Sequence, residues 1–370
     1  MIQRQRPGMN APSIFFSAMR PFQAARRLSS LDSACALHGH GFEARLVAPQ
    51  ADCRARFRGD EVRALQTMLE TPVAALDYRL INERIEEPDD TRLAEWLLSE
   101  TGLAGKAGLA LRSAPDCGAV VDPEGRRLAW RRFRFESAHC LPNVPAGHKC
   151  GRMHGHGFEV TLFTAIEPRE GATAAQASIA RAWHPLQTRL HLACLNDLPG
   201  LENPTSEVLG QWIWQGLGDS LPGLAGVTVM ETASAGCHFD GERWRIWKSM
   251  SFDSAVRLAQ APADDARRMI HGHTFTVRLH LSGSLERVMG WVHDYGDVKR
   301  RFDPLFRALD HQPLHEHPGL ADNDDASIAE QIESKMAAEL PALCRVDVLH
   351  TPGCGAVLLR GEDPREALEP

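Results

Sequence analysis

Several features that would assign a sequence to a familiar class are scarce in this chain of 370 residues. Its nine cysteines are too few for a disulfide-stapled scaffold and odd in number, which favours a reducing compartment. No apolar run approaches the ~18 residues that a membrane span needs, so we expect no membrane anchoring. Basic residues are outnumbered, with 41 Lys and Arg against 48 Asp and Glu, so a broad nucleic-acid-binding surface is not expected.

The first ten residues also lack the pattern of a secretory signal. Arg4 and Arg6 are not followed by an apolar segment and a small-residue cleavage site, so we expect a cytoplasmic protein. The hydrophobic share of 43% and the charged share of 24% are typical of a soluble globular protein. At roughly 100–200 residues per domain, the length suffices for two or three domains.

What the sequence does contain is an internal repeat. The tripeptide His-Gly-His occurs three times at nearly equal spacing, and a segment of the type Phe-x-Ser-Ala precedes each copy; such a period indicates repeated structural units. We place these units at 12–123, 124–243 and 244–362 and call them the first, middle and third unit. The tripeptides occupy 38–40, 154–156 and 271–273, and the preceding segments occupy 15–18, 135–138 and 252–255.

Each unit has the pattern strand, strand, helix, helix, strand, strand. In the middle unit, alternation along 133–139 and 154–162 predicts two strands that form a long hairpin. Asn203 as N-cap, with Pro204 at the first helical position, predicts the start of a helix. In the third unit a spacing of four residues predicts a helix through Ile328, Ile332, Met336 and Leu340.

A four-stranded antiparallel sheet with helices on one face leaves two edges unpaired, and unpaired edges must be covered or joined. Three units can join edge to edge. The sequence therefore predicts an α+β fold in which three ββααββ units close a twelve-stranded antiparallel barrel with pseudo-threefold symmetry and the helices outside. An open chain of three independent domains is the structural alternative.

Histidines of the middle unit form a candidate metal site. His154 and His156 lie two apart on one strand face, and His139 lies on the preceding strand, where cross-strand neighbours approach within ~5.5 Å. Three neutral nitrogen ligands with an open fourth position are typical of catalytic zinc. Met19 and Val256 replace His139 in the other units, so their histidine pairs lack a third ligand and we expect them to be structural.

A cysteine accompanies this cluster. Cys150 lies four residues before His154, and a thiolate near a divalent cation or an imidazolium has a lowered pKa and can act as a base or nucleophile. Ala34 and Arg267 occupy the equivalent positions. The candidate base is therefore confined to the middle unit.

Four stretches of the middle unit together carry a family resemblance: 135–139, 150–156, 195–207 and 230–232. With them the unit resembles the 6-pyruvoyl-tetrahydropterin synthase and 6-carboxytetrahydropterin synthase family. The outer units resemble it more faintly, so the whole chain is similar to three fused tandem copies. The resemblance implies tunnelling-fold units, three of which close a barrel.

The resemblance also implies chemistry. Members of this family are zinc lyases that act on 7,8-dihydroneopterin triphosphate, with a cysteine base, an Asp-His pair and a glutamate that anchors the pterin. Carried onto this chain, the Zn²⁺ ligands are His139, His154 and His156, the base is Cys150, and the substrate-binding residues are Glu231 and Thr232.

At one point the middle unit departs from the family. It has Leu-His-Leu at 190–192 where the family has Leu-Asp-His, whereas the third unit keeps this motif with Asp310 and His311. The resemblance implies active sites at subunit interfaces. We call the three histidines and Cys150 of the middle unit the metal half of the site. We therefore expect this metal half to meet Asp310 and His311 of the third unit within one chain, which gives one complete active site and not three.

Two products remain open. The spacing of Cys150 and the Pro-Thr-Ser-Glu run at 204–207 favour 6-carboxy-5,6,7,8-tetrahydropterin, made by the bacterial enzymes of queuosine precursor synthesis, over the 6-pyruvoyl product. The alternatives are a non-catalytic pterin-binding or scaffold protein and a purely structural barrel. The expected partner is a pterin triphosphate, and a homodimer of pseudo-trimers is left open because family trimers stack into hexamers.

Overall fold

The computed structural model of the protein describes residues 12–29, 37–167, 170–320, 322–361 and 363–368. Ala34 of the sequence comparison lies outside them. Within the described residues, two strands, two helices and two strands follow one another three times along the chain. The order of elements predicted from the repeat is therefore confirmed.

The elements have the following bounds. The first set comprises β1 (Ser13–Arg27), β2 (Leu37–Pro49), α1 (Glu61–Ala74), α2 (Asp90–Glu100), β3 (Gly108–Ala114) and β4 (Cys117–Val121). The second comprises β5 (Arg127–His139), β6 (His154–Ala165), α3 (Ala172–Leu190), the short β7 (Ala193–Cys194), α4 (Ser206–Leu217), β8 (Leu224–Thr232) and β9 (Ala235–Phe239). The third comprises β10 (Trp244–Val256), β11 (His271–Gly283), α5 (Tyr295–Leu309), α6 (Asp325–Met336), β12 (Leu343–Thr351) and β13 (Cys354–Leu359). Short 3₁₀ helices lie at Gln50–Asp52, Ile81–Glu83, Lys149–Gly151, Leu195–Asp197, Ala266–Arg268, Leu314–Glu316 and Pro364–Leu368.

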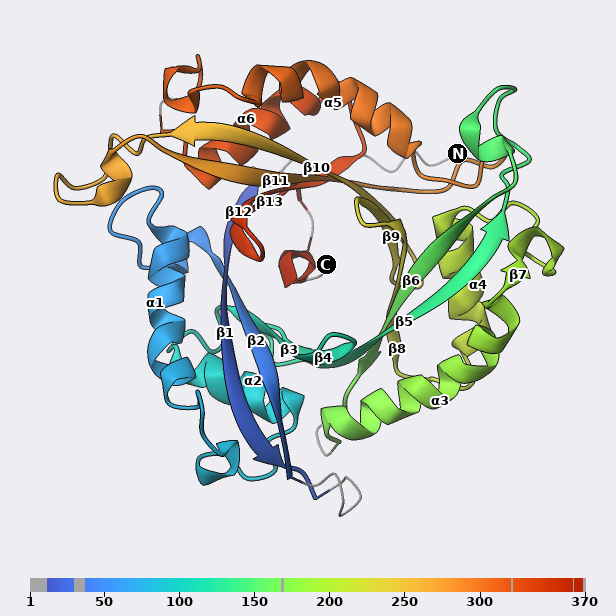
Figure 1. The fold of residues 1–370 in the computed structure, drawn as a ribbon, viewed down its shortest axis with the longest axis horizontal. Coiled ribbons are helices and arrows are strands. Elements are labelled where there is room, and N and C mark those ends of the chain that lie inside the picture. Colours follow the sequence, from blue (N-terminus) through green and yellow to red (C-terminus); the bar gives the residue numbers. More distant parts are fainter. Residues whose placement is uncertain (1–11, 30–36, 168–169, 321, 362, 369–370) are drawn as a thin grey trace, which may run out of the picture.

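Twelve of these strands form a closed antiparallel barrel with the six α-helices around it (Figure 1). The three sets join edge to edge through the pairs β4–β5, β9–β10 and β13–β1. β7 is an addition that pairs in parallel with the end of β5. The barrel predicted from unpaired sheet edges is confirmed, and the open chain of independent domains is excluded.

Close packing marks two of the three junctions. A Cβ atom added to Gly118 on β4 would lie 2.7 Å from the ring of Trp130 on β5, and one added to Gly236 on β9 would lie 2.3 Å from the ring of Trp247 on β10. Only a residue without a side chain lets the indole lie flat against the neighbouring strand. The Gly–Trp pairs therefore fix how adjacent sets meet.

The apolar core lies between the helices and the outer face of the barrel. In the middle unit the buried rings of Phe135 and Phe158 stack across the β5–β6 hairpin, with centroids 5.0 Å apart, beneath Trp183 of α3. The alternation that predicted this hairpin is confirmed by its register, in which His139 pairs with His154. The hairpin ends in the histidines of the candidate metal site.

Two helix details differ from the prediction. The N-cap of α4 is Thr205, whose hydroxyl accepts a hydrogen bond from Val208 N–H, so Pro204 lies before the helix and not at its first position. In α6 the apolar stripe ends at Met336, and the buried Leu340 follows the helix. Both differences concern helix ends, where capping geometry decides the boundary.

The last described segment of the chain lies inside the barrel. The 3₁₀ helix Pro364–Leu368 lies within the ring of strands (Figure 1), with Leu368 packed in an apolar cluster that includes Trp130. The carboxylate of Glu366 accepts hydrogen bonds from Arg245 at 2.9 Å and Arg243 at 3.0 Å. The sequence did not predict that this segment lies inside the barrel, because five residues are too few to show a periodic pattern.

A buried charge cluster stabilises the inner face of the barrel. Asp347 accepts hydrogen bonds from the guanidinium of Arg345, and its carboxylate lies 3.1 Å from His280 Nε2, with all three side chains at most 1% exposed. Asp347→Ala would remove the carboxylate that accepts two hydrogen bonds from the buried guanidinium of Arg345. We expect this change to lower the free energy of unfolding by about 3–5 kcal/mol, measured by urea titration.

The matched control is Asp303→Ala, which breaks the surface ion pair with Arg307. That pair is solvated, so its loss should cost at most about 1 kcal/mol. Equal effects of the two substitutions would contradict the role assigned to Asp347.

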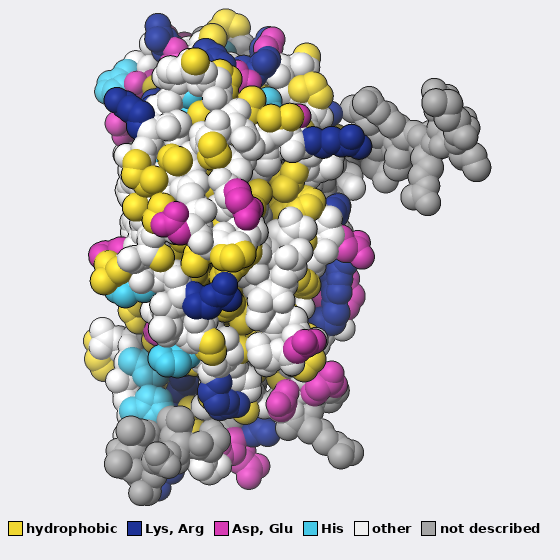
Figure 2. Space-filling model, turned by 90° about the vertical axis from the view of Figure 1, so that its right-hand side faces the viewer, with side chains coloured by type: hydrophobic (Ala, Val, Ile, Leu, Met, Phe, Trp, Pro, Cys, Tyr) yellow, Lys and Arg dark blue, Asp and Glu magenta, His cyan; other side chains and the backbone are white. Residues whose placement is uncertain are grey.

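The surface agrees with the charge balance of the sequence. Figure 2 shows acidic and basic side chains interspersed on the side of the molecule that carries α3 and α4. Among the described helices, none has the length and apolar character required to cross a membrane.

Candidate functional site

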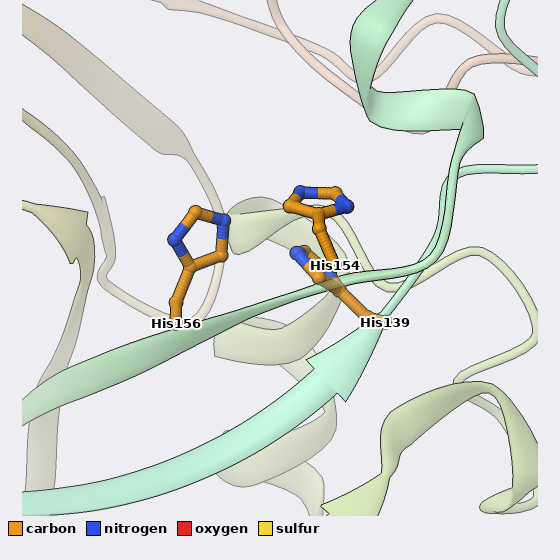
Figure 3. A group of neighbouring side chains, drawn as sticks. All are labelled: His139, His154 and His156. Atoms are coloured by element: carbon orange, nitrogen blue, oxygen red, sulfur yellow. The ribbon is translucent and has the colours of Figure 1, made fainter.

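Three histidines converge at the end of the β5–β6 hairpin where a loop joins the two strands (Figure 3). His139 is the last residue of β5, and His154 and His156 open β6. Ring centroids lie 4.6 Å apart for His139 and His154, 5.2 Å for His139 and His156, and 5.0 Å for His154 and His156. One nitrogen of each ring lies within 4.8 Å of the others, so the three can share one ion.

Hydrogen bonds orient two of these rings. His139 Nδ1 lies 3.1 Å from the carbonyl oxygen of Pro204, and His154 Nδ1 lies 2.7 Å from that of Arg152. A ring nitrogen that donates to a carbonyl leaves the other nitrogen as the acceptor, which is how metal-ligating histidines are commonly held. His139 Nε2 is buried and has no hydrogen-bond partner, as expected for a nitrogen that awaits a ligand.

The environment keeps two of the rings neutral. Burial lowers the pKa of His139 to about 4, and the neighbouring imidazoles act in the same direction. Burial also lowers the pKa of His156, assisted by His154 and Lys149. Neutral imidazole is the form that binds metal ions, so at neutral pH these two rings are ready to bind.

Cys150 lies in the loop that joins the two strands. The loop is closed by a hydrogen bond from Leu141 N–H to the Cys150 carbonyl oxygen at 2.8 Å. Burial raises the pKa of the Cys150 thiol; Lys149 opposes this shift, whereas Glu231 and Asp294 reinforce it. Glu231 and Asp294 therefore lie within electrostatic range of the Cys150 thiol.

Two carboxyl groups lie beside this loop, the buried Glu207 and the partly exposed Glu231. Burial raises the pKa of Glu231 to about 8 and that of Glu207 to about 7, and the charge of Glu207 adds to the shift of Glu231. Carboxyl groups of this kind become charged at low cost when a ligand supplies hydrogen-bond donors. Glu207 belongs to the Pro-Thr-Ser-Glu run of the sequence, but the sequence alone did not assign it to the site.

The third unit closes the site from one side. Asn203 donates to the Met289 carbonyl oxygen at 2.7 Å, and Thr205 donates to that of Gly290 at 2.6 Å. Val292 N–H donates to Glu207 Oε1 at 2.9 Å. The interface between the middle and third units, which we call the seam, therefore borders the candidate site.

Three lysines face this seam from different elements. Lys149 comes from the loop, Lys248 from β10 and Lys299 from α5. Burial lowers the pKa of Lys248, and the charges of Lys299 and Lys149 lower it further, so both lie within electrostatic range of Lys248. Lys248 and Lys299 join Lys149 only through tertiary structure, because they lie on elements far from it in the sequence.

Asp310 and His311 lie away from the three histidines and Cys150. Asp310 Oδ1 accepts from Asp253 N–H at 3.1 Å and lies 2.9 Å from His311 Nδ1, so the pair is formed as the family motif implies. It lies at the C-terminal end of α5, whereas Asp294 at the N-terminal end lies 3.6 Å from His148 in the Cys150 loop. At 1.5 Å per residue, the helix separates the two ends by about 24 Å.

We expected Asp310 and His311 to lie beside the three histidines and Cys150 within one chain, and this expectation is wrong. In Figure 1 the arrowheads of β5 and β10 lie toward opposite ends of α5. His311 is 75% exposed, and its charged neighbours are Asp310 and Asp253 of its own unit. The proposed metal ligands and Cys150 lie at the interface between the middle and third units, whereas Asp310 and His311 face solvent.

Thr232 also departs from expectation. It lines a separate cavity with Met230 and His191, whereas Glu231 acts on Cys150. A β-bulge at Glu231 accounts for the different environments of neighbouring residues, because it interrupts the β8–β9 register. The described contacts bring Glu231, and not Thr232, toward the metal cluster.

The raised pKa of Cys150 predicts slow alkylation of the metal-free protein. Only the thiolate reacts, so at pH 7.5 iodoacetamide should modify Cys150 more slowly than a free thiol of pKa ≈ 8.5, with the rate rising through pH 9. Peptide mass spectrometry measures the modification, with the partly exposed Cys194 as the internal control. A metal-free Cys150 that reacts as fast as a free thiol would contradict the assignment.

Comparisons with known proteins identify the family of the chain. The sequence model of the family "6-pyruvoyl tetrahydropterin synthase" matches residues 129–242 and 245–360, together more than half of the chain. The third unit is thus matched over its length, beyond the faint resemblance seen in the sequence. The 6-carboxy-5,6,7,8-tetrahydropterin synthase of Synechocystis is 34% identical over 125 residues, which cover 31% of this chain and 95% of that protein.

Solved structures of other proteins also match parts of this chain. The 6-pyruvoyl tetrahydropterin synthase of Caenorhabditis elegans is 19% identical and covers 32% of this chain and 96% of its own, with a TM-score of 0.29. The uricase of Arthrobacter globiformis is 8% identical and covers 59% of this chain and 80% of its own, with a TM-score of 0.31. On the two matches of the family model, the chain belongs to the 6-pyruvoyl tetrahydropterin synthase family and is a lyase of the 6-carboxy- or 6-pyruvoyl-tetrahydropterin synthase type.

Proposed function

We propose that the protein is a zinc-dependent lyase that converts 7,8-dihydroneopterin triphosphate to 6-carboxy-5,6,7,8-tetrahydropterin with loss of triphosphate. The observation that carries this proposal is the three-histidine cluster, with its unpartnered His139 Nε2, at the loop of Cys150. The similarity to the Synechocystis synthase supports the 6-carboxy product over the 6-pyruvoyl one.

The residues present fit zinc. His139, His154 and His156 would supply three nitrogen ligands and leave a fourth position open for substrate, the composition of catalytic zinc sites. When bound, Zn²⁺ supplies Lewis acidity toward the hydroxyl groups of the substrate side chain. The carbonyl oxygens of Pro204 and Arg152 would hold two of the rings for this task.

The remaining groups have separate tasks. Cys150 removes a proton from the substrate side chain, and Glu231 accepts the paired donors of the pterin amino group and ring N–H. Its raised pKa means that the free carboxyl group is largely protonated at neutral pH and loses its proton as the pterin donors bind. The carboxylate charge of Glu231 is then formed only where it is hydrogen-bonded.

The positive charges of Lys149, Lys248 and Lys299 favour a substrate with several negative charges. Lys149 and Lys299 each repel Lys248 in the free protein, and a bound triphosphate would relieve this repulsion. The group lies at the seam beside Cys150, where the leaving triphosphate would be held. Lysines commonly bind phosphate as point charges.

We further propose that Asp310 and His311 act on the site of a second copy of this chain. Their distance from the Cys150 loop within one chain, and the exposure of His311, support contact between molecules. A histidine held by a carboxylate can relay a proton near neutral pH. The homodimer that the sequence left open would then be required for turnover.

The decisive test is identification of the product. Zinc-loaded protein is incubated with 7,8-dihydroneopterin triphosphate, and mass spectrometry distinguishes the 6-carboxy product, formed with acetaldehyde, from the 6-pyruvoyl product. Pterin binding without turnover, retained in Cys150→Ala, would instead indicate a non-catalytic pterin-binding protein.

Glu231→Gln tests the pterin anchor. The amide keeps the shape but loses the charge-assisted bond, whose worth of about 1.5–3 kcal/mol corresponds to a rise in KM of about 10- to 150-fold. Zinc content should stay unchanged, because Glu231 is not a ligand in this assignment. A loss of zinc, or an unchanged KM, would contradict it.

A further inference from the structure

The third unit contains a second group of histidines. His271 and His273 open β11 with ring centroids 5.2 Å apart and planes at 87°, close to the 5.0 Å and 84° of His154 and His156. His271 Nδ1 lies 2.8 Å from the Met269 carbonyl oxygen, as His154 Nδ1 does from that of Arg152. The ligand-bearing strand end is therefore preserved in this unit.

A third imidazole reaches this pair from another strand. The strand position of His139 is Val256 here, which led us to expect a pair without a third ligand. His350, near the end of β12, instead brings its ring centroid to 5.1 Å from that of His273. The corresponding separation between His139 and His156 is 5.2 Å.

Asp325 orients this third imidazole. His350 Nδ1 lies 2.7 Å from the Asp325 carboxylate at the start of α6. A histidine that donates one N–H to a carboxylate leaves Nε2 as the free acceptor, the arrangement that commonly supports a metal ligand. The His350–Asp325 contact thus plays the part that the Pro204 carbonyl oxygen plays for His139.

The surrounding cavity suits a cation. It has a volume of about 310 Å³, lies between the third unit and α1, and is lined by four carboxylates (Glu61, Asp265, Asp324 and Asp325) against two guanidinium groups (Arg63 and Arg267). Arg267, at the position of Cys150, is held by ion pairs with Asp60 at 2.6 Å and Asp265 at 2.8 Å. Arg267 and Asp265 therefore compensate each other, and Asp324 pairs with Arg58 at 3.2 Å, so the negative charge available to a cation comes mainly from Glu61 and Asp325.

We propose that His271, His273 and His350 form a second binding site for a divalent transition metal such as Zn²⁺. The group is more open than that of the middle unit, so the ion would draw the rings together by side-chain rotation. Arg267 stands where the proposed base stands in the middle unit, so this second site is structural and ties the third unit together beside α1. It does not depend on the proposed enzymatic activity.

Metal stoichiometry tests the proposal. Metal-free protein is titrated with Co²⁺, whose visible absorption reports ligand number, and Zn²⁺ is counted with a chromophoric chelator. We expect two ions per chain in the wild type, one in His350→Ala, one in His139→Ala and none in the double variant. Asp325→Asn should keep the second ion but weaken its affinity about 10- to 100-fold.

The ion retained in the middle unit shows that His350→Ala is folded, and the exposed His184→Ala on α3 serves as the surface control. Stoichiometry of one in the wild type, or two ions retained in His350→Ala, would overturn the proposal. The latter result would direct attention to Asp253, Asp310 and His311, the other described cluster with ligand spacing.

Discussion

Replacing His139 with alanine should remove the metal ion of the middle unit and, with it, turnover. The substitution deletes the one imidazole of the cluster whose ring nitrogen is buried without a partner, and leaves His154 and His156 as two ligands at the edge of a strand. Changes that merely disturb ligand orientation cost about 10- to 100-fold in affinity, so loss of a ligand should cost at least about 100-fold.

Zinc content after dialysis and the rate of triphosphate release measure the two effects. His184→Ala, an exposed histidine of α3, is the matched control and should change neither. Because His139 also fills space beside Phe158, a His139→Gln variant separates loss of the ligand from loss of packing. Full activity of His139→Ala in metal-free buffer would refute a zinc mechanism.

Mixing two inactive variants should restore activity. If each site joins Cys150 of one chain to His311 of another, Cys150→Ala and His311→Ala each lack one half of every site. In a dimer, a mixed pair contains one intact site and one doubly altered site. Random exchange should therefore restore about a quarter of the wild-type rate.

The control mixes Cys150→Ala with His139→Ala. Both residues belong to the metal half of one chain, so no mixed dimer regains an intact site, and the rate should stay at the level of the single variants. Restoration by both mixtures would indicate residual activity of the variants, and restoration by neither would exclude a contribution of Asp310 and His311 between chains.

The barrel could be predicted from the sequence because its determinants are local and repeated. Alternation along 133–139 and 154–162 fixes which side chains share a face, and the register of β5 and β6 follows from that face. The same alternation brings His139 beside His154, so the candidate metal cluster was predictable residue by residue. The three-fold period then left edge-to-edge closure as the economical way to pair every strand.

Helix ends were less predictable. Asn203, Thr205 and Ser206 can all cap a helix, and the choice of Thr205 depends on its second hydrogen bond, to Gly290 of the third unit. That contact belongs to the seam between units. A local signal cannot encode it, because the partner lies 85 residues away.

The sequence by itself determined the repeat, the order of strands and helices, the hairpin and the three histidines at its end, since a period of two residues and a cross-strand register need no knowledge of distant contacts. Tertiary structure decided the rest. It set Asp310 and His311 at the far end of α5, enclosed Leu368 in the barrel and brought His350 beside His273. The physical reason is that distances between segments far apart in the chain are fixed by helix length and strand packing, which residue patterns within one unit do not specify.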